Sequence, residues 1–141
     1  MASENHTQAS VRHLGDARVL LTADRPDGAV HLAGFAAECA LKSCLAQAIP
    51  GFDTRAPSHS IPRLVDRETA WAAAASGHRD LQRALDGAAD PLLCDAHPDR
   101  RYWATSWSRA DAAHVVAKAS DIVEDRVIRP WLDRGLDLDL G

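Results

Sequence analysis

The stretch AVHLAGFAAECALKSCLAQAI, residues 29–49, decides the fold of this chain. It predicts a helix that is apolar on nearly every side, and such a helix belongs in the middle of a helical bundle. At roughly 100° per residue, His31, Glu38 and Lys42 fall within about 40° of one another and form one narrow polar line. Burying a carboxylate and an ammonium group is costly unless they are paired. The polar line therefore either pairs internally or faces a site or a partner.

The composition is that of a globular protein. The chain has 141 residues, of which 46% are hydrophobic, 26% charged and 5% aromatic. This length fits one domain, and we expect a single helical domain over residues 1–141, with its core at about 9–132 and a flexible N-terminus and C-terminal tail. The net charge of −4 argues against a broad basic clamp for nucleic acid but leaves room for a local basic site.

The cysteines and the N-terminus indicate the cell compartment. Cys39, Cys44 and Cys94 are odd in number and form no CxxC motif, so we expect reduced thiols in the core. The start of the chain, MASENHTQAS, lacks the basic and apolar regions of a signal peptide. No apolar run approaches the length of a membrane span. We therefore expect a cytoplasmic protein without membrane contact.

Helical spacing and breaker residues divide the first half of the chain. A first helix is predicted over residues 9–23, followed by the turn DRPDG at 24–28. The second helix then runs to Ile49 and stops at Pro50-Gly51. Such a short link between two long helices predicts an antiparallel hairpin.

Three more helices are predicted after the loop at 50–60. Ser60 is a plausible N-cap for a third helix that ends at Gly77, and a fourth covers residues 79–88. Ser108 and Asp111 match a capping box at the start of a last helix over 109–132. Its predicted apolar seam comprises Ala113, Val116, Ala119 or Ser120, Val123 and Val127. With no strand signal, we predict an all-α, up-and-down bundle of four to five helices.

Arg109 and His114 stand near the start of the last helix, at positions i and i+5. A helix N-terminus favours anions, and a guanidinium donates two parallel hydrogen bonds to a phosphate. Histidine moves protons near neutral pH. The pair would suit metal-free cleavage of an RNA phosphodiester, with Arg109 holding the phosphate and His114 exchanging the proton. The alternative is a solvated helix face.

A second set of residues precedes that helix. Arg100, Arg101 and Tyr102 are followed by Trp103 and Trp107. Arginines beside stacking rings are typical of single-stranded RNA binding. In the alternative reading, this segment is a loop that closes over the bundle, with the rings inside and the arginines in water.

Glu38 and Lys42 have the i, i+4 spacing of an ordinary helix ion pair. They either form a structural pair or orient Arg109, Arg101 or His114 from a facing helix. For His31 we expect a core or surface role, and for His59 a capping or loop role. The seven histidines are scattered, with no HExxH motif and no Cys/His ligand spacing, so we expect no metal. We also expect no cofactor, because the chain has no P-loop and no GxGxxG motif.

Taken together, these features resemble the HEPN family of small all-helical domains. The resemblance lies in DGAVHLAGFAAECALK at 27–42, HSIPRLV at 59–65, RRY at 100–102, the RxxxxH pattern at 109–114 and the order of the helices. It covers roughly residues 9–132, and the first stretch is the most specific part.

The resemblance implies a bundle that forms a homodimer. Many members of the family are metal-independent ribonucleases in which an Arg and a His from both subunits form one composite site, which assigns catalysis to Arg109 and His114. Many bacterial members are toxins paired with a small nucleotidyltransferase. The chain has Ala110 where active members often have a polar residue, and Val116 where some toxins have a tyrosine.

Two functional hypotheses follow. In the first, the protein is a metal-independent endoribonuclease of the toxin–antitoxin type with a composite Arg109/His114 site. In the second, it is a non-catalytic HEPN module that binds a nucleotide, RNA or a nucleotidyltransferase partner. The second hypothesis assigns binding to a set of five residues, Glu38, Lys42, Arg100, Arg101 and Tyr102.

Overall fold

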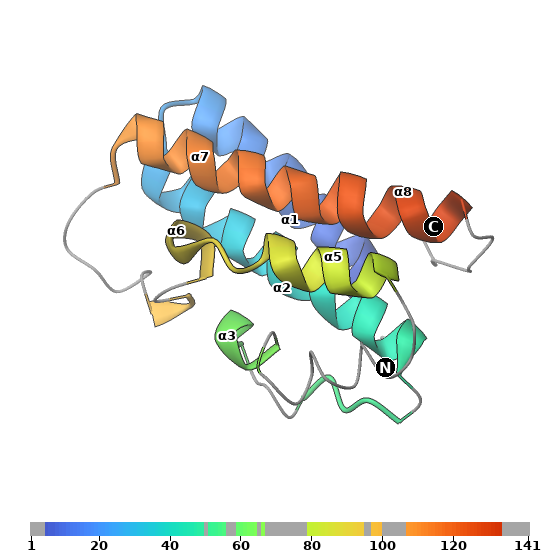
Figure 1. Ribbon diagram of the computed structural model, residues 1–141. Coiled ribbons are helices and arrows are strands. Elements are labelled where there is room, and N and C mark those ends of the chain that lie inside the picture. The colour runs from blue at the N-terminus through green and yellow to red at the C-terminus, as the bar shows by residue number, and fades with distance from the viewer. Residues whose placement is uncertain are drawn as a thin grey trace, which may run out of the picture.

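The computed structural model describes residues 5–49, 51–55, 59–64, 66, 79–94, 97–99 and 107–133 (Figure 1). Within these ranges every regular element is helical and none is a strand, which confirms the all-α prediction. The elements are α1 (His6–Thr22), α2 (Pro26–Ala48), α3 (Ile61–Leu64), α5 (Arg79–Gly87), α6 (Pro91–Cys94), α7 (Arg109–Ser120), η2 (Asp121–Ile128) and α8 (Arg129–Asp133).

α1 and α2 form the predicted antiparallel hairpin and pack side by side along their lengths (Figure 1). α1 begins where the Asn5 side chain accepts a hydrogen bond from the backbone N–H of Gln8 at 2.9 Å. The chain reverses within residues 23–25, where Asp24 adopts a left-handed φ of 58°. Pro26 then opens α2 in the first helical turn, where the N–H that proline lacks has no intrahelical partner.

α2 is the central helix, and 15 of its 23 residues are buried. By length and hydropathy alone this helix could cross a membrane, which corrects our reading that no apolar run is long enough. However, 78% of its most apolar window is buried within the protein. Such burial is typical of a core helix, as residues 29–49 predict.

The last helix is continuous through α7, η2 and α8 (Figure 1). Ser108 caps it by accepting a hydrogen bond from the backbone N–H of Asp111 at 3.1 Å, as predicted. Its middle section, η2, has π-helical turns. The buried seam comprises Ala112, Val115, Val116, Ala119, Ile122, Val123 and Val127.

Our prediction for the start of this seam is wrong, because Ala113 is exposed and Ala112 is buried. Val115 and Val116 are both buried. The side of the helix that faces the core is therefore centred between the directions of these two side chains. Ala112 lies three and four positions before these valines and therefore shares their face, whereas Ala113 points roughly 100° away from Ala112.

Shorter helices cover the remaining faces. α5 matches the predicted fourth helix and packs against η2, where Arg126 binds Asp121 and the carbonyl oxygen of Arg83.

α3 and α6 both pack against α2. Ser60 caps α3 by accepting from the backbone N–H of Arg63 at 3.3 Å. The rest of the predicted third helix, to Gly77, lies outside the described residues.

Candidate functional site

Glu38 is the centre of a buried polar network that links three parts of the chain. It lies on α2 with a side chain that is 3% exposed. Its Oε2 atom lies 3.0 Å from Nζ of Lys42 and 3.1 Å from Nδ1 of His59. Its Oε1 atom lies 3.0 Å from Nε2 of His97, whose side chain is fully buried. Glu38 therefore joins α2 to the loop before α3 and to the loop after α6.

The ionisation of Glu38 follows from these contacts. Burial by itself raises the pKa of the carboxyl group. Hydrogen bonds from His97, Lys42 and His59 outweigh this effect and lower the pKa from 4.5 to about 2. Glu38 is thus a carboxylate at neutral pH and only accepts hydrogen bonds. It follows that Nδ1 of His59 and Nε2 of His97 are both donors.

Four histidine rings surround Phe35 one turn before Glu38 on α2. The ring centroids of His31, His59 and His97 lie 5.0, 5.5 and 4.7 Å from that of Phe35, each in an edge-on arrangement. His13 of α1 lies at 6.0 Å, with its ring tilted. These four histidines are scattered in the sequence, but the fold brings their rings together at Phe35.

An open pocket of about 600 Å³ lies over this network. Arg12, His13 and Phe35 are among its lining residues, together with Lys42 and His59. Among the described residues that line it, Glu38 alone is acidic. The full lining comprises Asn5, His6, Gln8, Ala9, Arg12, His13, Phe35, Glu38, Cys39, Lys42, Thr54, Arg55 and His59.

Two exposed arginines stand at this pocket from different elements. Arg12 projects from α1, and Arg55 follows the end of α2 in the loop at 51–55. Neither guanidinium forms an ion pair with a carboxylate in the described part of the chain. They contrast with Lys42, whose charge is buried and paired with Glu38. The pocket lining therefore combines a buried, paired charge with two exposed cations.

Glu38 and Lys42, which the sequence singles out together, are both confirmed as a buried ion pair at this pocket. The alternative that they orient Arg109 or His114 is wrong within this chain, because these two bind Asp24 and Asp90. Arg101, the third residue of that alternative, lies outside the described residues. Glu38 is instead occupied by Lys42, His59 and His97.

Arg109 and His114 lie apart from this pocket and bind different carboxylates. Nε2 of His114 lies 2.9 Å from Oδ2 of Asp90, at the junction of α5 and α6. Arg109 is 65% exposed and lies 3.9 Å from Asp24, in the turn between α1 and α2. Burial raises the pKa of Asp90, but hydrogen bonds from His114 and from the Leu93 N–H outweigh it and leave that pKa lowered. Arg100, Arg101 and Tyr102 lie outside the described residues.

Sequence reasoning misses five residues of this site, namely His13, His59, His97, Arg12 and Arg55. For His59 we predicted only a capping or loop role, and the other four are not singled out. One signal was present, because a carboxylate in the middle of an apolar helix requires more than one donor. That requirement predicts partners for Glu38 but does not say where in the chain they are.

The pocket also contains a thiol. Burial, and next the charge of Glu38, raise the pKa of Cys39 to about 11, and burial raises that of Cys44 to about 12. Both cysteines are buried and free, which confirms the prediction of reduced core thiols for these two. Among the described residues, no three His, Cys, Asp or Glu side chains are placed to share a metal ion.

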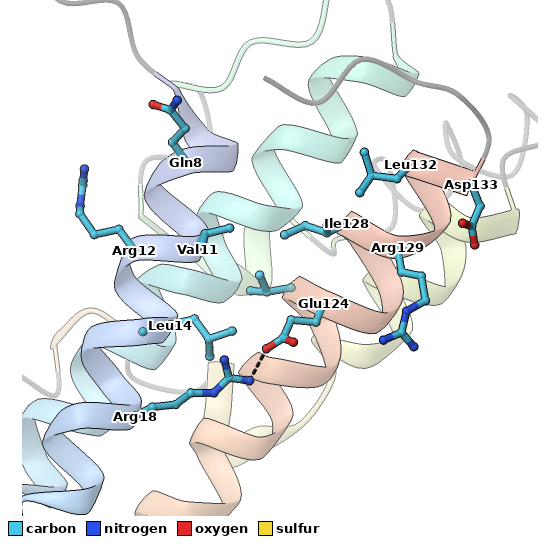
Figure 2. Close-up of a pocket in the computed structure, with 12 residues that line it drawn as sticks. Gln8, Val11, Arg12, Leu14, Arg18, Glu124, Ile128, Arg129, Leu132 and Asp133 are labelled. Carbon is cyan, nitrogen blue, oxygen red and sulfur yellow. Dashed lines mark hydrogen bonds and ion pairs between the residues drawn. The ribbon is translucent and has the colours of Figure 1, made fainter. Parts of the chain in front are cut away.

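A larger groove of about 770 Å³ runs between α1 and the end of the last helix (Figure 2). Leu14, Val11 and Leu132 line it with other apolar groups, and Arg18 is paired there with Glu124 (Figure 2). This groove contains no histidine. We therefore place the candidate site at the Glu38 pocket.

No protein-family model, curated protein or solved structure matches the chain. The functional argument therefore depends on the geometry of the Glu38 pocket and on the residues of the chain.

Proposed function

We propose that this protein is a cytoplasmic, homodimeric HEPN-like module that acts on RNA and binds its phosphates at the Glu38 pocket. It shares with the second hypothesis from the sequence the binding of RNA at a site that includes Glu38 and Lys42. The observation that carries it is the charge of the pocket lining, where Arg12, Lys42 and Arg55 face a single carboxylate. A local cluster of cations on a protein of net charge −4 attracts a polyanion to that place.

The two exposed arginines are suited to phosphate recognition. A guanidinium presents a planar set of donors that matches two phosphate oxygens. Arg12 and Arg55 line one pocket from separate elements, and we assign each of them to one phosphate of the strand. Lys42 contributes less to binding in this proposal, because its charge is already paired with Glu38.

A binding assay tests this proposal. Fluorescence anisotropy of a labelled single-stranded RNA, with EDTA present, gives the affinity and its salt dependence. We expect Arg12→Ala/Arg55→Ala to weaken binding about tenfold and to reduce the slope of log K against log salt by about 1.4, or about 0.7 for each lost phosphate contact. The matched control is Arg63→Ala, since Arg63 is exposed on α3 and does not line the pocket. Equal binding by the double variant and the wild type would contradict the proposal.

A second candidate is cleavage at a composite Arg109/His114 site across the dimer. The hydrogen bond between His114 and Asp90 favours it, because a carboxylate bound to one ring nitrogen orients a histidine for proton transfer. An Arg109→Ala/His114→Ala variant tests this candidate. It should abolish cleavage of labelled RNA in EDTA while leaving the anisotropy unchanged.

A further inference from the structure

We propose that His13 and His59 are a general acid–base pair that cleaves RNA at the Glu38 pocket without a metal ion. This inference rests on the proposed binding of RNA at the same pocket. It differs from the composite-site candidate because both residues belong to one chain and neither lies on the last helix.

The two histidines line the same pocket, and each ring lies near that of Phe35. The centroid of Phe35 lies 6.0 Å from that of His13 and 5.5 Å from that of His59. His13 comes from α1 and His59 from the loop before α3. Displacement at a phosphodiester requires the attacking and leaving oxygens to lie on opposite sides of the phosphorus. We assign one of these two positions to each histidine, because His13 and His59 reach one pocket from separate elements.

Glu38 fixes the orientation of His59. Nδ1 of His59 donates to Oε2 of Glu38 at 3.1 Å, so the second ring nitrogen, Nε2, is the atom available to substrate. The side chain of His59 is 55% exposed, and Nε2 forms no hydrogen bond in the described part of the chain. Donation from Nε2 leaves the neutral ring with its proton on Nδ1, which is the form that the carboxylate binds. We therefore assign His59 as the acid and Glu38 as its positioning residue.

His13 is suited to act as the general base. Burial, and next the charge of Arg12, lower the pKa of His13 below its usual 6.5. Its ring is therefore mostly neutral at about pH 7, with a lone pair that can accept a proton. A neutral base and a second, carboxylate-bound histidine in one pocket are the pairing that acid–base catalysis requires.

The reaction balances without a further reactant. His13 takes the proton of the ribose 2′-hydroxyl as the 2′-oxygen forms a bond to phosphorus. The bond from phosphorus to the 5′-oxygen breaks, and that oxygen receives the proton from Nε2 of His59. The products are a 2′,3′-cyclic phosphate and a 5′-hydroxyl. Exchange of one proton with water restores each ring.

The test uses the full chain with labelled RNA in EDTA, and identifies the new ends by mass spectrometry. We expect 2′,3′-cyclic phosphate ends from RNA and no cleavage of the DNA of the same sequence. His13→Asn and His59→Asn should each slow cleavage by about a hundredfold or more. The matched control is His31→Asn, because His31 also contacts Phe35 edge-on but does not line the pocket. An equal loss in this control would overturn the proposal.

Two further measurements separate chemistry from folding. External imidazole should restore cleavage by His59→Ala, which a purely structural histidine would not allow. A ribonucleoside 3′-(p-nitrophenyl phosphate) has a leaving group that needs no proton. His59→Asn should therefore cleave it at a rate near that of the wild type, whereas His13→Asn should not. The reverse pattern would overturn the assignment of acid and base.

The binding assay separates this inference from the proposed function. Wild-type protein that binds RNA with Arg12 and Arg55 but leaves it intact between about pH 5 and pH 8 would overturn only the inference. A failure to bind would refute the proposed function as well. Cleavage that survives in His13→Asn/His59→Asn and is lost only in Arg109→Ala/His114→Ala would assign the chemistry to the composite site and overturn the inference.

Discussion

The Oε2 atom of Glu38 lies 3.1 Å from Nδ1 of His59, a residue 21 positions further along the chain. This contact connects the most buried helix of the protein to a loop whose histidine is half-exposed. Lys42 and His97 bind the same carboxylate from inside the protein. Glu38 is therefore held by two buried groups and by one half-exposed histidine at the open pocket.

Removing Lys42 should destabilise the protein much more than removing an exposed partner of another ion pair. Lys42→Met leaves the buried Glu38 carboxylate with one donor fewer, and we expect a loss of about 3 kcal/mol in the free energy of unfolding. In Arg129→Ala, the lost ion pair with Asp125 is exposed, and the expected loss is below about 1 kcal/mol. Urea unfolding of both variants measures the difference. Equal losses would show that the network does not stabilise the fold.

Glu38 should also make the free energy of unfolding depend on pH. Its pKa is about 2 in the folded protein, below the ordinary value of 4.5 that applies to the unfolded chain. The stabilisation is therefore fully present above about pH 4.5 and is lost as the pH falls toward about 2, by about 3 kcal/mol in total. Glu38→Gln should lack this part of the pH dependence. Urea unfolding at a series of pH values tests this, and parallel curves for the two proteins would contradict the shift.

Two glycines provide a matched pair of substitutions. A Cβ atom at Gly34 would lie 3.0 Å from Cε1 of the buried His97 ring and closer still to its Nδ1. Gly34→Ala should therefore displace His97 from Glu38 and destabilise the protein by about 1–3 kcal/mol. A Cβ at Gly15, on α1, meets nothing within 4 Å, so Gly15→Ala should stabilise it by about 0.5–1 kcal/mol. Thermal unfolding of both variants tests this contrast. A shift of the unfolding midpoint in the same direction for both variants would contradict the prediction.

The buried thiols should react slowly. In a Cys94→Ser background only Cys39 and Cys44 remain, and burial raises the pKa of each to about 11 or 12. Thiolate is the reactive form, so we expect little labelling by maleimide at about pH 7 and complete labelling in denaturant. Mass spectrometry counts the labels. Rapid labelling of the folded protein at Cys39 would indicate that the pocket opens further than the structure indicates.

The helices were predictable because their signals are local. The run at 29–49 indicates a central helix whatever the rest of the chain does, and Ser108 and Asp111 mark the start of the last helix. The shift of its seam from Ala113 to Ala112 was not predictable in this way. It depends on which of two adjacent faces meets the core, and that choice is made by tertiary packing.

The candidate site was predictable only in part. Glu38 and Lys42 stand at i and i+4 on one helix, so their pairing follows from sequence spacing alone. His97 lies 59 residues from Glu38, and no local pattern links the two. For Arg109 and His114, the spacing in sequence did not anticipate that each binds a different carboxylate of its own chain.

The most direct measurement is a crystal structure of the protein with a short single-stranded RNA whose 2′-hydroxyls are methylated, so that the strand cannot be cut by its own 2′-oxygen. The account predicts phosphate density within hydrogen-bond distance of Arg12 and Arg55, with a phosphodiester between His13 and His59. Phosphate density at Arg109 and His114, with the Glu38 pocket empty, would contradict it.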